Sequence, residues 1–125
     1  MKTILVTGGA GYIGSHVCKE LSKASYVPVT YDNLVNGHES LVKWGPLEKG
    51  DLIDSHRING VFNRYNPDAV MHLAALTDVG ESVLDPWKYY YNNVTGSIYL
   101  FEAMRRYKIN KIVYCLQFAV YCSLD

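Results

Sequence analysis

The chain has 125 residues, of which 49% are hydrophobic, so it is long enough for one domain with a sizeable core. Twelve basic residues balance twelve acidic ones, which leaves no surplus charge of the kind that binds nucleic acid or an anionic membrane. No apolar run approaches the roughly 18 to 20 residues that span a bilayer. Three cysteines without a Cys-x-x-Cys pair favour a reducing compartment. We therefore expect a cytoplasmic protein without nucleic-acid, membrane or metal ligands, since the four histidines form no metal-binding cluster either.

A glycine-rich turn follows the first predicted strand, residues 4–6. Gly8, Gly11 and Gly14 recur at every third position and precede an apolar helix pattern over residues 12–24. In a dinucleotide-binding fold, the first glycine permits the turn, the second admits a pyrophosphate to the backbone, and the third packs the helix against the sheet. The first helical N–H groups then face the phosphates. The alternative is an ordinary tight turn between a strand and a helix.

An acidic residue, Asp32, follows the second predicted strand, residues 27–31, and lies about 20 residues past the glycines. A carboxylate there is expected to accept hydrogen bonds from the adenosine ribose and to repel a 2′-phosphate, which favours NAD over NADP. The alternative is that Asp32 caps the turn before Asn33. Pro28 is an objection to the strand, because proline cannot donate to a ladder. Residues 33–45 are read as a loop with a short helix.

The third strand is expected over residues 47–50 as a short, exposed element, followed by a helix over 54–65. Asp51 lies between them, where its carboxylate could accept a hydrogen bond from the adenine amine. The alternative is that Asp51 or Asp54 caps the helix. The helix has an apolar face made of Ile58, Val61, Phe62 and Tyr65.

The fourth strand is predicted over residues 69–73, with His72 as a hydrogen-bonded core histidine and not a ligand. A short helix is expected to end before Pro86, and the longest helix covers residues 89–107. Its predicted apolar stripe consists of Val94, Ile98, Phe101 and Met104, widened by Leu100. A fifth strand follows over 111–115. Strands and helices alternate, which predicts an α/β fold with a doubly wound parallel sheet, a Rossmann fold of about five strands in the order 3-2-1-4-5.

Several of these segments together resemble the extended short-chain dehydrogenase/reductases. The matching segments are the glycine turn Thr7–His16, the ribose turn Asp32–Leu34, the adenine edge Gly50–Leu52 and the strand signature His72–Ala75. Two more, Val79–Val83 and Tyr89–Gly96, resemble the UDP-sugar 4-epimerases of that family more than its dehydratases. The resemblance is strong over residues 1–114 and weakens after them.

The resemblance implies that residues 1–125 are an incomplete NAD-binding domain. It implies reversible hydride transfer between NAD and C4 of a UDP-sugar, which interconverts UDP-galactose and UDP-glucose. The long helix resembles one with which the family dimerises, so a homodimer is left open. The implied NAD-binding residues are Gly8, Gly11, Tyr12, Ile13, Gly14, Asp32, Asn33, Leu34, Val35, Asn36, Gly37, Asp51, Leu52, Leu73, Ala74, Ala75, Leu76, Thr77 and Asn92.

The chain departs from the family pattern where catalytic residues are expected. Gln117 stands at the position of the family's catalytic serine or threonine, and the family's Tyr-x-x-x-Lys pair and sugar domain are expected beyond Asp125. The one Tyr-x-x-x-Lys match, Tyr107 to Lys111, straddles a predicted helix end and is rejected as catalytic. We thus expect residues 1–125 alone to bind NAD without catalysis. The alternatives are another sugar-nucleotide epimerase or dehydratase, and a non-catalytic NAD-binding module.

Overall fold

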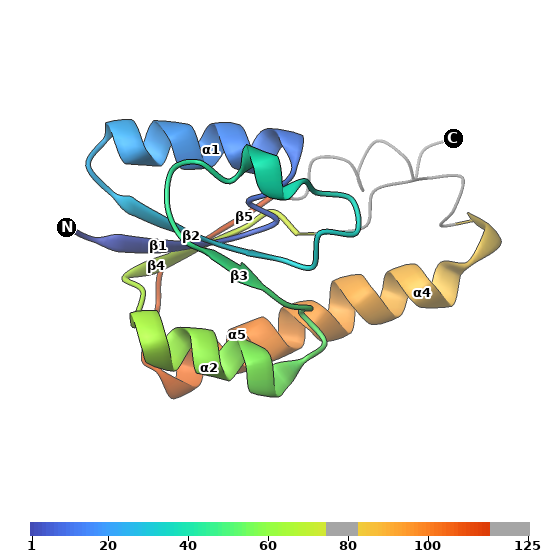
Figure 1. The fold of residues 1–125 in the computed structure, drawn as a ribbon. Helices are drawn as coiled ribbons and strands as arrows, with labels where there is room; N and C mark the ends of the chain where they lie inside the picture. The colour runs from blue at the N-terminus through green and yellow to red at the C-terminus, as the bar shows by residue number, and fades with distance from the viewer. Residues whose placement is uncertain (75–82, 116–125) are drawn as a thin grey trace.

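The computed structural model describes residues 1–74 and 83–115, which form a parallel five-stranded sheet with helices on both faces (Figure 1). The strand order is β3-β2-β1-β4-β5, and every neighbouring pair is parallel. The predicted Rossmann topology is therefore confirmed. The strands are β1 Thr3–Thr7, β2 Val27–Asp32, β3 Leu47–Lys49, β4 Ala69–His72 and β5 Ile112–Tyr114.

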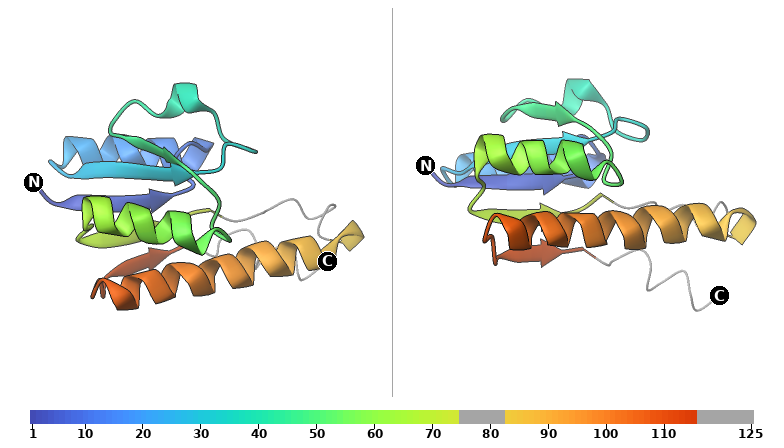
Figure 2. Two further views of the ribbon diagram at one scale, coloured as in Figure 1. Left: turned by 60° about the horizontal axis from the view of Figure 1, so that its bottom comes forward. Right: turned by 90° about the horizontal axis from the view of Figure 1, so that it is seen from below.

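The central strands are apolar on both sides because each side faces a helical layer. Helix α1, Tyr12–Lys23, covers one face, and α2, Ser55–Tyr65, covers the other together with α5, Gly96–Arg106 (Figures 1 and 2). Side chains of a strand point alternately to the two faces. Leu5 accordingly belongs to the core under α2 and α5, whereas Ile4 and Val6 pack with Cys18 of α1.

Pro28 is tolerated in β2 because of the direction in which its nitrogen points. Val27 N–H bonds to β1 through Lys2 O, so the nitrogen of Pro28 faces the β3 side. Pairing with β3 begins only at Thr30, whose N–H donates to Pro46 O. The proline therefore stands ahead of the ladder to which it could not donate.

Helix α2 resolves the alternatives for the two aspartates at its start. Asp54 is the N-cap, and its Oδ1 accepts from the N–H of Arg57 at 3.0 Å. Asp51 is left outside the helix. The helix ends at Asn66, which adopts the left-handed conformation with a φ of 43°. In the loop between β2 and β3, the expected short helix is present as the 3₁₀ turn Glu39–Leu41.

The long helix begins three residues earlier than predicted. Helix α4, Pro86–Tyr90, continues through a π-helical turn, Tyr91–Thr95, directly into α5. Proline was read as a stop, but Pro86 occupies the first helical position, where its missing N–H is harmless. Asp85 caps the helix by accepting from the N–H of Lys88 at 3.2 Å. Residues 83 and 84 are helical, and the rest of the short helix predicted there lies outside the described residues.

The predicted apolar stripe of the long helix was only half right. Leu100 and Met104 are buried, but Val94, Ile98 and Phe101 are 40%, 48% and 43% exposed. The buried face is completed by small residues, which are Gly96, Ser97 and Ala103. Apolar spacing shows that a face exists, but it does not show which face packs when the helix has two.

The two edge strands differ from each other. β3 was expected to be exposed, yet Glu48 at its centre is only 7% exposed. Its carboxylate accepts from Arg57 at 2.5 Å, from Arg64 at 3.1 Å and from the hydroxyl of Tyr65 at 2.7 Å, all on α2. All three residues of β5 are exposed. Within residues 1–74 and 83–115, no helix is both long and apolar enough to cross a membrane.

Candidate functional site

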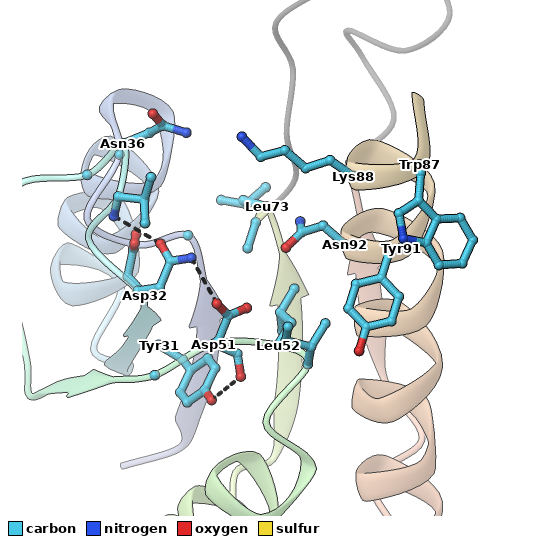
Figure 3. Close-up of a pocket in the computed structure, with 18 residues that line it drawn as sticks. Tyr31, Asp32, Asn36, Asp51, Leu52, Leu73, Trp87, Lys88, Tyr91 and Asn92 are labelled. Carbon is cyan, nitrogen blue, oxygen red and sulfur yellow. Dashed lines mark hydrogen bonds between the residues drawn. The ribbon is translucent and has the colours of Figure 1, made fainter. Parts of the chain in front are cut away.

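A cleft of about 530 Å³ lies at the carboxyl ends of the strands (Figure 3). β1 stands at the centre of the sheet order, and the chain leaves it toward β2 on one side and returns to β4 on the other. Such a reversal opens a crevice at the strand ends, which is where open α/β sheets bind their ligands. The cleft has both polar and apolar walls.

The glycine turn forms one wall, and its three glycines differ in what surrounds them. Gly8 has a φ of 74°, and a Cβ there would lie 2.9 Å from the nitrogen of Ala74. A Cβ on Gly14 would overlap the carbonyl oxygen of Gly8, so α1 packs closely on the turn. At Gly11, a Cβ would meet only Gly8 O, at 3.4 Å. The space that the sequence motif assigns to a phosphate is therefore open.

The N-terminus of α1 has no side-chain cap. Gly11 is the N-cap residue, and the first N–H that bonds back to it is that of Ser15. The N–H groups of the first turn have no intrahelical acceptor in any helix, and with the helix dipole they attract an anion. The backbone of Gly11 lines the cleft. This helix end can therefore hold a phosphate group.

Asp32 caps the turn, as the alternative reading of the sequence proposed, and it also lines the cleft. Its Oδ1 accepts from the N–H of Leu34 at 2.8 Å, which is the Asx turn, and its Oδ2 accepts from the N–H of Ala10 at 3.0 Å. The carboxylate thus ties the end of β2 to the glycine turn while it lines the cleft. Leu34 adopts a left-handed φ of 64°, a strained conformation of the kind found at ligand-binding turns.

Asp51 faces the cleft beside the ribose turn. Its Oδ2 lies 3.5 Å from the side-chain nitrogen of Asn33, and its carbonyl accepts from the hydroxyl of Tyr31 at 2.6 Å. Burial, together with the charges of Asp54 and Asp51, raises the pKa of Tyr31. Tyr31 therefore keeps its proton and holds the Asp51 backbone as a donor.

The long helix forms the opposite wall. Figure 3 shows two side chains pointing from the helix into the cleft, Lys88 toward Asn36 and Asn92 toward Leu73. Trp87 and Tyr91 lie beside them on the helix. The ring of Trp87 stacks on that of Tyr91, with the two ring centroids 5.8 Å apart. Asn92 was predicted, whereas the other three were missed. Trp87 and Lys88 were missed because the predicted helix began too late to include them, and Tyr91 was missed although it lay inside that helix. With its start at Pro86, the four-residue spacing of Lys88 and Asn92 places both on one face.

Most of the predicted site residues come together in this cleft. Its predicted members are Gly8, Gly11, Asp32, Asn33, Val35, Asn36, Gly37, Asp51, Leu52, Leu73, Ala74 and Asn92. The cleft also includes Tyr31, Gly50 and Ile53, which the sequence reasoning missed although they adjoin predicted positions.

Four predicted residues do not line the cleft: Tyr12, Ile13, Gly14 and Leu34. The side chains of Tyr12 and Ile13 belong to a separate apolar groove against Met71, so only their backbone can serve the predicted role. The predicted positions Ala75, Leu76, Thr77 and Gln117 lie outside the described residues.

Two titratable candidates have structural roles. His72 is 3% exposed, its two ring nitrogens are both hydrogen-bonded, and burial lowers its pKa to about 4. It is the core histidine that was predicted. Tyr107 ends α5 and stacks on Phe62 at 5.9 Å, while Lys111 precedes β5. The pair shares no helical turn, as expected. Among the described side chains, no three His, Cys, Asp or Glu residues gather to hold a metal ion.

A parallel sheet of this order, with a glycine turn facing an acidic residue at the next strand end, defines a Rossmann domain of the dinucleotide-binding class. A profile of the NAD dependent epimerase/dehydratase family matches residues 4–123, and the chain belongs to this family. The family resemblance seen in the sequence motifs is thereby confirmed.

The chain is similar to characterised members of the family. UDP-glucose 4-epimerase of Rhizobium meliloti (strain 1021) is 52% identical over 118 residues, covering 94% of this chain and 36% of the relative. The crystal structure of UDP-glucose 4-epimerase from Brucella ovis in complex with NAD has a TM-score of 0.89 at 46% identity, over 91% of this chain and 35% of that one. The crystal structure of UDP-glucose 4-epimerase from Bifidobacterium longum in complex with NAD+ and UDP has a TM-score of 0.90 at 34% identity, over 96% of this chain and 38% of that one. The chain therefore spans little more than a third of these relatives.

Proposed function

We propose that this chain is the NAD-binding part of a UDP-glucose 4-epimerase, which interconverts UDP-galactose and UDP-glucose in nucleotide-sugar metabolism. The observation that carries the proposal is the open backbone at Gly11, at an uncapped helix end, opposite the carboxylate of Asp32. The 52% identity to an enzyme of that name supports the choice within the family.

The residues present fit NAD. The volume of the cleft lies within the range of about 300–1,000 Å³ that is usual for small-molecule sites. The first turn of α1 would hold the pyrophosphate, and Asp32 would accept from the ribose through the lone pairs that the backbone leaves unused. Asp51 would accept from the adenine amine. Leu73, with Ala74 and Asn92, would border the nicotinamide.

The chemistry is divided between the cofactor and the protein. Bound NAD supplies a reversible acceptor for the hydride at C4 of the sugar. The described residues of this chain would bind and orient the dinucleotide. The family resemblance assigns the proton transfer to a Tyr-x-x-x-Lys pair within one helix, which Tyr107 and Lys111 do not form. We therefore propose that residues 1–125 alone bind NAD without epimerising UDP-galactose, and that activity belongs to a polypeptide that also carries the family's Tyr-x-x-x-Lys pair.

A homodimer and a cytoplasmic location are part of the same proposal. The exposed side chains Val94, Ile98 and Phe101 recur along one side of the long helix, which is the kind of apolar patch that a symmetric partner covers. Cys18 and Cys115 are both free thiols, which suits a reducing compartment.

The cofactor is tested by calorimetric titration with NAD and with NADP. We expect NAD to bind and NADP to bind at least about tenfold more weakly, because Asp32 would repel the 2′-phosphate. Asp32→Asn should reduce the ratio of the NADP to the NAD dissociation constant. Asp68→Asn is the matched control, since Asp68 also accepts from a backbone N–H, that of Thr3, but at the far end of β1. Equal affinity of the unaltered chain for both dinucleotides would refute the assignment of Asp32.

A further inference from the structure

A line of buried hydroxyl and imidazole groups crosses the molecule from β1 to the long helix. Thr7 is 0% exposed, His72 is 3% exposed and Ser97 is 6% exposed. The Oγ1 of Thr7 lies 2.6 Å from Nδ1 of His72, and Nε2 of His72 lies 3.0 Å from Oγ of Ser97. The Ser97 hydroxyl donates in turn to the carbonyl of Asn93 at 2.6 Å. The proposed binding of NAD uses none of these three side chains.

The donors and acceptors in this line allow one arrangement of protons. The Oγ1 of Thr7 already accepts from the N–H groups of Leu73 and Ala74, at 3.1 and 3.2 Å. A hydroxyl has two lone pairs, so Thr7 gives its own proton to Nδ1 of His72. The imidazole then carries its proton on Nε2 and donates to Ser97, whose proton goes to Asn93. Every bond points toward the helix.

The line ends at the π-helical turn Tyr91–Thr95, where a side chain enters the helix ladder. Asn93 lies within that turn, and its carbonyl accepts the hydroxyl of Ser97. Single π-helical turns inside α-helices are rare and occur frequently at functional sites. The neighbouring Asn92 lines the cleft, and its Nδ2 donates to Oδ1 of Asn93 at 3.2 Å. The last acceptor of the line is thus one residue away from a side chain in the cleft.

We propose that His72 and Ser97 are positioning residues: together they hold the π-helical turn in its register and so keep Asn92 directed into the cleft. The proposal rests on NAD binding for its ligand, but the arrangement of the turn is a property of the free protein. Figure 3 shows Asn92 pointing from the helix toward the cleft, beside Leu73 at the end of β4. Because Leu73 directly follows His72, His72 holds in place both the end of β4 and the part of the long helix that lines the cleft.

The surroundings of His72 keep its ring neutral, as the proton arrangement requires. Burial lowers the pKa of His72 to about 4. The titratable group beside it is Tyr114 of β5, whose ring lies edge-on at 4.9 Å and whose hydroxyl lies 3.3 Å from Oγ of Ser97. A neutral imidazole can accept at one nitrogen and donate at the other, whereas a charged one can only donate.

The test compares three variants. Ser97→Ala removes the hydroxyl, and Ser97→Thr keeps it. Thr30→Val is the matched control, because Thr30 is also buried and its hydroxyl lies 3.6 Å from Cys18, on the opposite face of the sheet. We expect Ser97→Ala to weaken NAD binding about tenfold, Ser97→Thr to restore it, and Thr30→Val to leave it unchanged.

Two measurements on the free protein do not depend on NAD. Hydrogen exchange should show amides 92–97 exchanging about tenfold faster in Ser97→Ala than in the unaltered chain, with α1 and α2 unchanged. Nitrogen NMR of the unaltered chain should show His72 as the Nε2–H tautomer between about pH 5 and 8.

The outcomes separate the two proposals. If the unaltered chain binds no NAD, the proposed function fails, and the exchange and tautomer measurements alone decide on the positioning role. The positioning role is overturned if His72 carries its proton on Nδ1. It is also overturned if Ser97→Ala leaves amides 92–97 as protected as before, or if it accelerates exchange evenly across the sheet and helices as a general loss of stability would.

Discussion

Gly11→Ser is the substitution that should separate ligand binding from stability, because it should weaken one and raise the other. Gly11 has a φ of −81° and a ψ of 178°, which any L-residue adopts, and a Cβ there meets nothing closer than 3.4 Å. Serine is also a better N-cap than glycine by a few tenths of a kcal/mol. Reduced freedom of the unfolded chain adds about 0.4–1 kcal/mol. We expect stabilisation of about 0.6–1.3 kcal/mol and a melting temperature about 2–6 °C higher.

The same serine should weaken NAD binding strongly. Its hydroxyl would accept from the N–H groups of the first turn of α1, and its Cβ would fill the open space at the cleft wall. A hydrogen bond to a charged group contributes about 1.5–3 kcal/mol. The loss of two such bonds to a pyrophosphate, offset in part by relaxation of the turn, gives about 3 kcal/mol. The dissociation constant should therefore rise about a hundredfold.

Calorimetric titration and thermal melting of the same samples provide the assay. Gly60→Ala is the matched control: Gly60 lies within α2, and a Cβ there meets nothing within 4 Å. It should stabilise the fold by about 0.5–1 kcal/mol through helix propensity and leave NAD affinity unchanged. If Gly11→Ser binds NAD as tightly as the unaltered chain does, the pyrophosphate is not at the start of α1 and the reasoning fails.

The remaining predictions concern stability. Gly14→Ala should destabilise the fold by about 3 kcal/mol in urea titrations, because the new Cβ overlaps the backbone of Gly8; a loss below about 1 kcal/mol would contradict the packing described. Burial is the largest single influence on Glu48 and opposes its ionisation, but the hydrogen bonds from Arg57 and Tyr65 together with the charges of Arg57 and Arg64 outweigh it and hold the pKa of Glu48 below its usual value. Glu48→Gln should thus lose about 1–2 kcal/mol at pH 7, and the difference should shrink as the pH falls below about 4, where the carboxylate is protonated. Because the pKa of His72 is lowered to about 4 in the folded protein, the unfolded chain binds a proton first as the pH falls below about 6.5. The free energy of unfolding of the unaltered chain should therefore fall by about 2 kcal/mol more between pH 7 and 5 than that of His72→Gln. Parallel plots of unfolding free energy against pH for the two proteins would show that the ring titrates normally.

The fold was predictable because its signals are local and agree with one another. The glycine triplet, the apolar strands and the alternation of strands with helices all indicate one topology, and the structure has that topology. The acidic residue after β2 was also found from its spacing. The bond to Leu34 is the turn cap that was given as the alternative role of Asp32. The bond to Ala10 was not predicted, because a sequence does not show which backbone N–H groups converge on a carboxylate.

The long helix shows where sequence reasoning failed and why. Pro86 can end a helix or begin one, and the sequence before it did not decide between these roles. The error removed Lys88 and Trp87 from the predicted site. Regular spacing also assigned Val94 and Phe101 to the buried face, whereas the structure buries the side of α5 that carries Ser97, Leu100 and Met104. Ser97 was overlooked because a serine in an apolar helix carries no signal until its buried partner is known.

The measurement that tests the central claim most directly is an NMR titration of the ¹⁵N-labelled chain with NAD. The account predicts saturable shifts at the glycine turn from Gly8 to Gly14, at Asp32 and Asp51, and at Asn92 across the cleft. Amides at the opposite, amino ends of the strands, such as that of Asp68, should not shift. The absence of saturable shifts, or shifts confined to the groove of Tyr12 and Met71 on the other side of α1, would contradict it.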